Sequence, residues 1–351
     1  MSHMVANKVV VICPVKNESW IIDCFLKAAS EYADHIILGD HGSTDDTVGR
    51  SLKFPKVTIV DSKSSGFDER LRRNRLLDEA RKLGPNNLIL AVDADEIIDP
   101  RFIENGGIKR LLALPIGTRI HFPSFNLFTD FRGYWESPVG ATGFIDDGSV
   151  HFKTSEIHFP RIPPSEFQGS LRKKLRKYTN EYGGLVHFQY LDWGRVLSKT
   201  LWYKAWEVAN VTDRSILQIY RRYEHIQLVH KRKVNELPSA WMPFFQKIGV
   251  PEAVLRSKSI GKYWWEAETA DLMAKTSETT LSILGFDTSM SEKSASKSKS
   301  STYEARLTSY LILTRDLSQF SLHLLPRLIL KLMDWTFDLA YLPRRASKRY
   351  S

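Results

Sequence analysis

Two aspartates stand two positions apart in the segment Asp93-Ala94-Asp95-Glu96, directly after the apolar run 88–92. Ionised carboxylates are costly to bury, so the run should end at Asp93 and leave both side chains in solvent. Carboxylates at this spacing can share one Mg²⁺ or Mn²⁺ ion, which completes its shell with water and substrate phosphate oxygens. The segment therefore indicates a metal site for a phosphorylated ligand. The alternative is an acidic turn before a helix that Pro100 helps to start.

A second polar segment, 40–47, reads DHGSTDDT and follows the apolar run 36–38. Asp40, at the end of this run, can accept hydrogen bonds from a base or a ribose. Gly42 permits a tight turn, and Ser43 or Thr44 can cap a following helix. An ordinary capped turn between a strand and a helix gives the same pattern.

Two further segments carry polar or basic groups. The segment 14–18, PVKNE, follows the apolar run 9–12 and offers a polar loop. The segment 70–75, RLRRNR, concentrates arginines that can pair with a diphosphate, although such runs are usually solvated faces.

The elements that position these segments alternate in type. Short apolar runs at 9–12, 36–38, 57–60 and 88–92 predict buried strands, and the spacing in 21–29 and 68–83 predicts helices between them. This alternation predicts an α/β fold with a mostly parallel, Rossmann-like sheet covered by helices on both faces. Ligands of such sheets collect at the carboxyl ends of the strands, where the polar segments lie.

The next part of the chain has a different pattern. In residues 115–190 aromatic residues, Gly and Pro are frequent, which predicts short strands and long loops that contact an acceptor. Helical spacing returns from Leu197 onward. The two cysteines, Cys13 and Cys24, lie in apolar patterns and are expected to be reduced core residues.

The ordered segments VVVICPVKNE, IILGDHGSTDDT, RRN and LILAVDADE resemble glycosyltransferase family 2, in its bacterial branch with KNE, D-x-GSTD-x-T, RN and D-x-DE motifs. The resemblance covers residues 7–125 firmly and continues loosely through 185–190 and 199–204. It implies the GT-A fold, a UDP- or GDP-linked sugar donor and a divalent metal, Mn²⁺ or Mg²⁺.

The resemblance also implies roles for single residues. The residues implied to bind the nucleotide-sugar are Pro14, Lys16, Asn17, Glu18, Asp40, Arg73 and Asp93. The residues implied to bind the metal are Asp93, Asp95 and His187, and the alternative for His187 is a structural histidine.

The identity of the catalytic base stays open. The branch often has a Val-His-Glu segment, whereas this sequence has Glu156-Ile157-His158-Phe159, with Phe in place of the Glu. The remaining candidates for the base are Glu156, Asp147 and Asp146, each of which can instead be a surface acid.

The function expected from these features is inverting sugar transfer to an acceptor hydroxyl, in envelope polysaccharide or glycolipid synthesis. One alternative is a nucleotidyltransferase, but the Gly-rich phosphate loop that would favour it is not found at 14–18. Another is a non-catalytic, membrane-associated protein that binds nucleotide-sugars, which Phe159 keeps open.

The net charge of +10 favours an anionic partner, and dispersed basic residues without a recognition motif argue against nucleic acid. Residues 303–351 are Leu-rich with a basic end, which predicts two amphipathic helices interrupted at Pro326. They can make peripheral contact with the inner face of the cell membrane or pack on protein. The expected partners are the donor and a saccharide or lipid-linked acceptor. We expect a cytoplasmic location, because no secretory signal or spanning run is visible.

Four parts of the chain are predicted. They are a GT-A domain at 5–225, a helical extension at 226–287, a Ser/Lys-rich linker at 288–302, and amphipathic helices with a basic tail at 303–351.

Overall fold

The computed structural model describes residues 7–63, 68–149, 151–152, 161, 175–211, 214–227, 229, 232–276, 280, 302–319 and 324–341. The chain divides into two compact units. The first comprises Met1–Trp193 with Val234–Ile260, and the second comprises Gly194–Lys233 with Gly261–Ser351.

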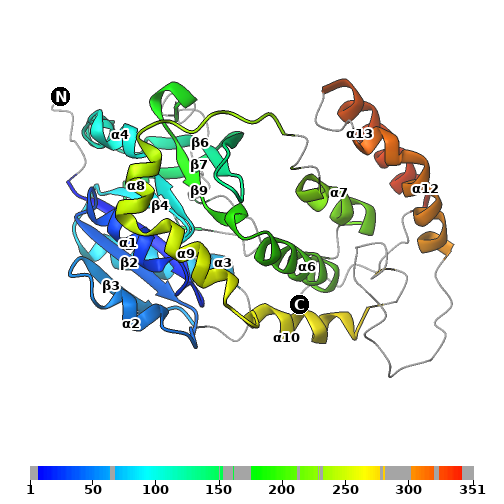
Figure 1. Ribbon diagram of the computed structural model, residues 1–351, viewed down its shortest axis with the longest axis horizontal. Coiled ribbons are helices and arrows are strands. Elements are labelled where there is room, and N and C mark those ends of the chain that lie inside the picture. The colour runs from blue at the N-terminus through cyan, green and yellow to red at the C-terminus, as the bar shows by residue number, and fades with distance from the viewer. Residues whose placement is uncertain are drawn as a thin grey trace. The chain divides into compact units, whose positions relative to one another are not determined.

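The first unit is built on one mixed sheet with the strand order β3-β2-β1-β4-β7-β6-β9-β5, and β8 pairs with β6 (Figure 1). The strands of its parallel half are β1 (Val9–Val15), β2 (His35–Asp40), β3 (Val57–Asp61) and β4 (Leu88–Ala91). The strands of the other half are β5 (Glu96–Ile98), β6 (Arg119–Leu127), β7 (Tyr134–Ile145), β8 (Leu175–Lys177) and β9 (Leu185–His187).

Alternate residues of β1 enter two different hydrophobic cores. Val9, Val11 and Cys13 pack with the buried residues of α1 (Ile22–Ser30), α8 (Trp241–Ile248) and α9 (Val250–Lys258). Val10 and Ile12 pack with those of α3 (Glu69–Lys82) on the other face. Because both faces are covered, the strands are continuously apolar. The predicted α/β class, with a mostly parallel sheet between helices, is confirmed.

The segment 115–190 contains longer strands than its sequence pattern predicted. β6 has 9 residues and β7 has 12, and their pairing shifts register between Ile120 and His121 and again between Phe122 and Ser124. These irregularities interrupt the two-residue period by which a strand is recognised. Gly143 of β7 is needed where the strands approach closely, since a Cβ there would lie 2.5 Å from the carbonyl oxygen of Ile89.

The remaining helices of the first unit are short. They are α2 (Thr47–Ser51), α4 (Pro100–Glu104) and α5 (Gly107–Leu112). The 3-10 turns η2 (Asn180–Tyr182) and η3 (Gln189–Leu191) flank β9. Cys13 and Cys24 are buried free thiols.

The second unit is helical. Its helices are α6 (Trp193–Asn210), α7 (Ile216–Gln227), α10 (Trp264–Met273), α12 (Thr302–Gln319) and α13 (Leu324–Tyr341). Leu217, Tyr223, Leu307 and Phe337 belong to its core. The two helices predicted within 303–342 are confirmed. Pro326 lies in the first turn of α13 rather than between the helices, where its missing N–H breaks no intrahelical bond.

The two units do not coincide with the domain boundaries predicted from the sequence. The chain leaves the first unit after Trp193 and returns to it at 234–260, which include α8 and α9. Trp241 of α8 donates its indole N–H to Asp99 Oδ1 at 3.0 Å, and the Phe245 ring lies 5.5 Å from that of Phe188. Such long-range packing leaves no local sign in the sequence. Residues 288–301 of the predicted linker and the basic residues after 341 lie outside the described residues.

Candidate active site

The first acidic motif lies where β4 leaves the sheet. Val92 N–H still donates to the carbonyl oxygen of Ile12 in β1, at 3.2 Å. The chain then turns, because Glu96 N–H donates to the carbonyl oxygen of Asp93 at 3.0 Å and the Glu96 carboxylate accepts from Asp93 N–H at 3.1 Å. Asp93 therefore stands at the carboxyl end of the parallel strands, where ligands of such sheets collect.

Pairing of β5 with β9 brings His187 to this motif. Glu96 lies opposite His187 in the ladder, and Phe188 N–H donates to the carbonyl oxygen of Asp95 at 2.8 Å. His187 Nε2 consequently lies 3.6 Å from Asp95 Oδ2. Its other nitrogen, Nδ1, lies 3.2 Å from Oδ1 of the buried Asn126. The sequence positions of Asp95 and His187 are distant, and the sheet makes them neighbours.

Asn126 gives the His187 ring a defined orientation. The Asn126 amide Nδ2 donates to Ser137 Oγ at 2.8 Å, which leaves Oδ1 as the group that faces His187. An Nδ1–H donor to this oxygen leaves Nε2 directed at Asp95, the arrangement in which imidazole ligates a cation. Burial lowers the pKa of His187, but the carboxylates of Asp95 and Glu96 outweigh it, and the net pKa is raised.

Arg161 is the residue at this site that sequence reasoning missed. Its Nη2 lies 2.7 Å from Asp93 Oδ2 and 2.9 Å from Glu96 Oε1, and its Nη1 pairs with Glu96 Oε2. The pKa of Arg161 is raised, because these carboxylates outweigh the opposing effect of burial. Its sequence context, Pro160-Arg161-Ile162, holds no signal that links it to residues more than sixty positions away.

Negative charge gathers around the buried thiol of Cys13, next to the acidic motif. Its pKa is raised well above the ordinary value, first by burial and then by Asp93, Glu18, Asp95 and Glu96. Cys13 lies in β1, so these four carboxylates lie near the ends of the two adjacent strands β1 and β4. A region with this charge attracts a cation, and Arg161 is one cation that pairs with it.

The residues at this site fit an incomplete metal shell. Among the described residues, no group of three or more His, Cys, Asp or Glu side chains is arranged to hold a metal ion. Asp95 and His187 offer one carboxylate and one imidazole, while Asp93 is engaged with Arg161. Mn²⁺ and Mg²⁺ commonly take few protein ligands and fill the rest of the shell with water and phosphate oxygens. The donor set therefore suits a cation that arrives with a diphosphate.

The second polar segment closes the neighbouring end of β2. Its Asp40 carboxylate accepts hydrogen bonds from the N–H groups of Gly42 and Ser43, at 3.1 to 3.2 Å. Gly42 has a φ of +71°, which favours glycine. The Asp40 carboxylate therefore stabilises the turn that follows β2. This is the role expected if the segment is an ordinary turn between a strand and a helix.

The loops after β1 and β2 are tied together by Asn17. Its backbone N–H donates to Ser43 Oγ at 2.9 Å, and its Oδ1 accepts from Thr44 N–H at 2.7 Å. Asn17 itself has a φ of 54°, a conformation that Asn tolerates better than most residues. The two loops form one polar edge beside the carboxylates.

The other residues of the PVKNE segment flank this edge. Pro14 is the sixth residue of β1, and Lys16 follows the strand. Glu18 N–H donates to Thr47 Oγ1 at 2.8 Å, and the Glu18 carboxylate accepts from the Trp20 indole at 2.6 Å. Glu18 thus acts on the site through its charge while it also holds the buried Trp20.

Arg73 is buried in α3 rather than displayed on a solvated face. Its Nε lies 2.6 Å from Glu69 Oε1, and its guanidinium lies 6.0 Å from the centroid of the Phe152 ring. Asn74 holds the backbone of Phe152 with two hydrogen bonds, of 2.7 and 3.0 Å. These contacts give the RN pair a structural function, and contact of Arg73 with nucleotide stays a prediction.

The candidates for the base separate in space. Asp147 follows β7, whose last residue Ile145 pairs with Leu88, the first residue of β4. Asp147 therefore lies near the start of β4, at the end opposite to Asp93. Its side chain is exposed. Asp146, beside it, forms two hydrogen bonds with Arg81 at 2.9 and 3.0 Å. Glu156 lies outside the described residues.

No protein-family model matches the chain, and no curated protein matches it. The solved structures that it resembles include glucosyl-3-phosphoglycerate synthase from Mycobacterium tuberculosis, in complex with Mn²⁺, UDP and glucosyl-3-phosphoglycerate. The identity is 21%, the match covers 34% of this chain and 44% of that chain, and the TM-score is 0.25.

A second similar structure is 4-diphosphocytidyl-2C-methyl-D-erythritol synthase, with 11% identity, 72% of this chain and 100% of that chain covered, and a TM-score of 0.25. The chain spans less than half the length of the mycobacterial synthase, at 44%.

Proposed function

We propose that the chain is a metal-dependent glycosyltransferase that moves a sugar from a UDP- or GDP-sugar to an acceptor hydroxyl, with inversion. One observation supports it above the others. Carboxylates from the ends of β1 and β4 gather with His187 at the edge where ligands of a parallel sheet bind. A cluster of like charge is unfavourable without a cationic partner, and the metal ion that binds the diphosphate would supply one.

The proposed roles follow the order of the motifs. Asp95 and His187 would hold the cation, with Asp93 beside them, and a Mn²⁺ or Mg²⁺ ion there would supply positive charge to the leaving diphosphate. The residues proposed to bind the nucleotide-sugar are Pro14, Lys16, Asn17, Glu18, Asp40, Asp93 and Arg73. Of these, Arg73 would contact the base or a phosphate. Arg161 leaves Asp93 when the donor arrives and pairs with a phosphate oxygen, since a guanidinium pairs with phosphate as readily as with carboxylate.

Proton removal from the acceptor hydroxyl requires a carboxylate within reach of it. We assign this to Glu156 in preference to Asp147, because Asp147 lies at the opposite end of β4. The proposed acceptor is a saccharide or a lipid-linked saccharide of an envelope polysaccharide or glycolipid.

A panel of UDP- and GDP-sugars with Mn²⁺ tests the proposal, with thermal stability and release of nucleoside diphosphate as readouts. At least one donor should raise the unfolding temperature and be hydrolysed or transferred. Asp95→Ala and His187→Ala should remove both effects, whereas Asp271→Ala, a change at an exposed residue of α10, should remove neither.

The panel also separates the rival functions. Release of pyrophosphate from a nucleoside triphosphate would assign a nucleotidyltransferase. Metal-dependent binding without any turnover would assign a non-catalytic nucleotide-sugar-binding protein. Failure of every donor to bind would overturn the proposal.

A further inference from the structure

The helix α13 has both of its acidic residues on the inside, and Trp335 and several leucines on the outside. By sequence it contains two acidic residues, Asp334 and Asp338. Asp338 is buried, and the Asp334 side chain is 15% exposed. A helix on the surface of a soluble protein is expected to turn its apolar residues inward and its charged residues to solvent.

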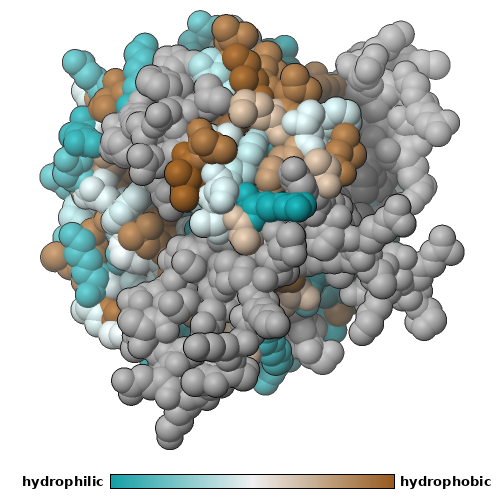
Figure 2. Space-filling model, turned by 90° about the vertical axis from the view of Figure 1, so that its right-hand side faces the viewer, coloured by the Kyte–Doolittle hydropathy of each residue, from teal (hydrophilic) through white to brown (hydrophobic). Residues whose placement is uncertain are grey.

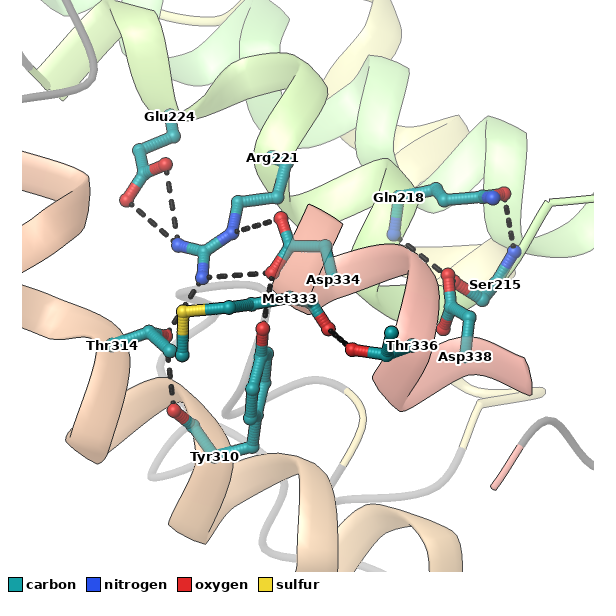
Figure 3. A network of polar contacts seen from close by, with 10 residues as sticks. All are labelled: Ser215, Gln218, Arg221, Glu224, Tyr310, Thr314, Met333, Asp334, Thr336 and Asp338. Atoms are coloured by element: carbon teal, nitrogen blue, oxygen red, sulfur yellow. Dashed lines mark hydrogen bonds and ion pairs between the residues drawn. The ribbon is translucent and has the colours of Figure 1, made fainter. Parts of the chain in front are cut away.

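The inward face of α13 is held by a polar network (Figure 3). Arg221 of α7 donates to both oxygens of Asp334, at 3.0 and 3.3 Å, and Tyr310 of α12 donates to Asp334 Oδ1 at 2.9 Å. Ser215 Oγ donates to Asp338 Oδ2 at 2.8 Å. These bonds fix which side of α13 faces the rest of the unit.

The network therefore turns an apolar stripe outward. The exposed fractions are 62% for Leu332, 60% for Trp335 and 67% for Leu339. Three further residues at helical spacing extend the stripe and are also exposed: Leu325, Leu328 and Ile329. Figure 2 shows one face of the molecule, on which hydrophobic residues gather in several places. Contiguous apolar patches of this kind mark interaction sites.

The charges beside the stripe have one sign. Arg327 and Lys331, four residues apart, are both exposed. By sequence, the segment 344–349 adds four cations and no acid. Both acids of the helix are already paired inward.

We propose that the outward face of α13 binds the surface of an anionic phospholipid bilayer, with the stripe in the acyl boundary and Arg327 and Lys331 at the headgroups. Apolar area and basic charge act together in this kind of binding. Trp335 suits it because indole favours the membrane interface. Among the described residues no helix is long and apolar enough to span a membrane, and the proposed contact needs no span. This inference deepens the predicted membrane contact and is independent of glycosyl transfer.

Charge favours lipid over a second copy of the chain. In a symmetric dimer through this face, two copies of the same patch meet, so both copies bring the positive charges of Arg327 and Lys331 to one interface. Like charges at an interface are unfavourable, whereas anionic headgroups attract them.

Vesicle co-sedimentation of the full chain tests the proposal without any sugar donor. The probes are phosphatidylcholine vesicles with about one-third phosphatidylglycerol, and pure phosphatidylcholine vesicles. We expect binding to the anionic vesicles to be at least about tenfold stronger and to weaken with salt. The double variant L332Q/W335Q should lose about tenfold or more in partitioning. Arg327→Gln with Lys331→Gln should remove the preference for anionic vesicles.

Leu255→Gln is the matched control, because Leu255 of α9 is 69% exposed and belongs to the other unit. It should bind vesicles as the wild type does. A wild type that does not sediment with anionic vesicles, or an L332Q/W335Q variant that binds equally well, overturns the proposal. A lipid-free dimer that L332Q/W335Q dissociates in sedimentation velocity also overturns it and assigns the face to a second copy.

Discussion

Arg161 and Asp93 form an ion pair, with Nη2 2.7 Å from Oδ2, at the end of β4 where the sequence predicts a divalent cation. The same guanidinium also pairs with Glu96. Arg161 thus neutralises part of a carboxylate cluster that would attract a metal. A cation of the chain and a cation from solution would compete for this charge.

Replacement of Arg161 should therefore strengthen metal binding. In Arg161→Ala, we expect the affinity for Mn²⁺ to rise about tenfold, equivalent to about 1.4 kcal/mol, because Asp93 becomes available and a like charge is removed. Titration of Mn²⁺ by electron paramagnetic resonance measures it. Arg70→Ala is the control, since Arg70 pairs with Asp68 on an exposed part of α3. Equal affinities of Arg161→Ala and the wild type would show that Arg161 does not compete.

Asn74 should stabilise the first unit through the backbone of Phe152. Asn74→Ala removes two hydrogen bonds and leaves the partly buried N–H and C=O of Phe152 without these partners. We expect the free energy of unfolding to fall by about 1–3 kcal/mol. Urea unfolding measures this loss, with the exposed Asn105→Ala as the control. A loss no larger than that of the control would contradict the role given to Asn74.

The Arg221–Asp334 pair should hold α13 in its orientation. Asp334→Ala leaves Tyr310 without this acceptor and leaves Arg221 with Glu224 as its remaining carboxylate, so we expect a loss of about 2 kcal/mol. Hydrogen exchange in α7 and α13 should accelerate accordingly. The double variant R221M/D334L should lose less than the sum of the two single losses, because each single change already breaks the Arg221–Asp334 pair. If the double variant were as unstable as the sum of the singles, the pair would not be coupled.

Lys204 should make stability depend on pH. Burial lowers its pKa from 10.5 to about 8. Between these values the unfolded chain binds a proton that the folded chain lacks, so the free energy of unfolding rises as pH rises from about 8 to 10.5. Below pH 8 both states are protonated, and this residue adds no slope.

Lys204→Met isolates this effect from other groups that titrate in the same range. It should remove this dependence on pH, a change in the free energy of unfolding on the order of 3 kcal/mol between pH of about 8 and 10.5. Urea unfolding at several pH values measures it, with Lys262→Met, at an exposed position, as the control. An unchanged slope in Lys204→Met would mean that Lys204 keeps its ordinary pKa in the folded protein.

The sequence by itself determined the parallel half of the sheet and the polar residues at its strand ends. Runs such as Val9–Ile12 and Leu88–Val92 are local signals, because a strand buried on both faces is continuously apolar. A carboxylate that follows such a run must lie at the strand end, so Asp40 and Asp93 could be positioned without the fold. The two C-terminal helices were also predictable, because their Leu-rich amphipathic pattern is a local signal too.

Tertiary structure alone decided which distant residues meet. His187 reaches Asp95 through the pairing of β5 with β9, and Arg161 reaches Asp93 from a segment without any local signal. Asp147 lies at the other end of β4 because β7 runs antiparallel to it. Periodicity predicts that α13 has two faces, but contacts with Arg221 and Ser215 decide which one points outward. Such contacts depend on residues far apart in the chain, and no spacing along a single segment encodes them.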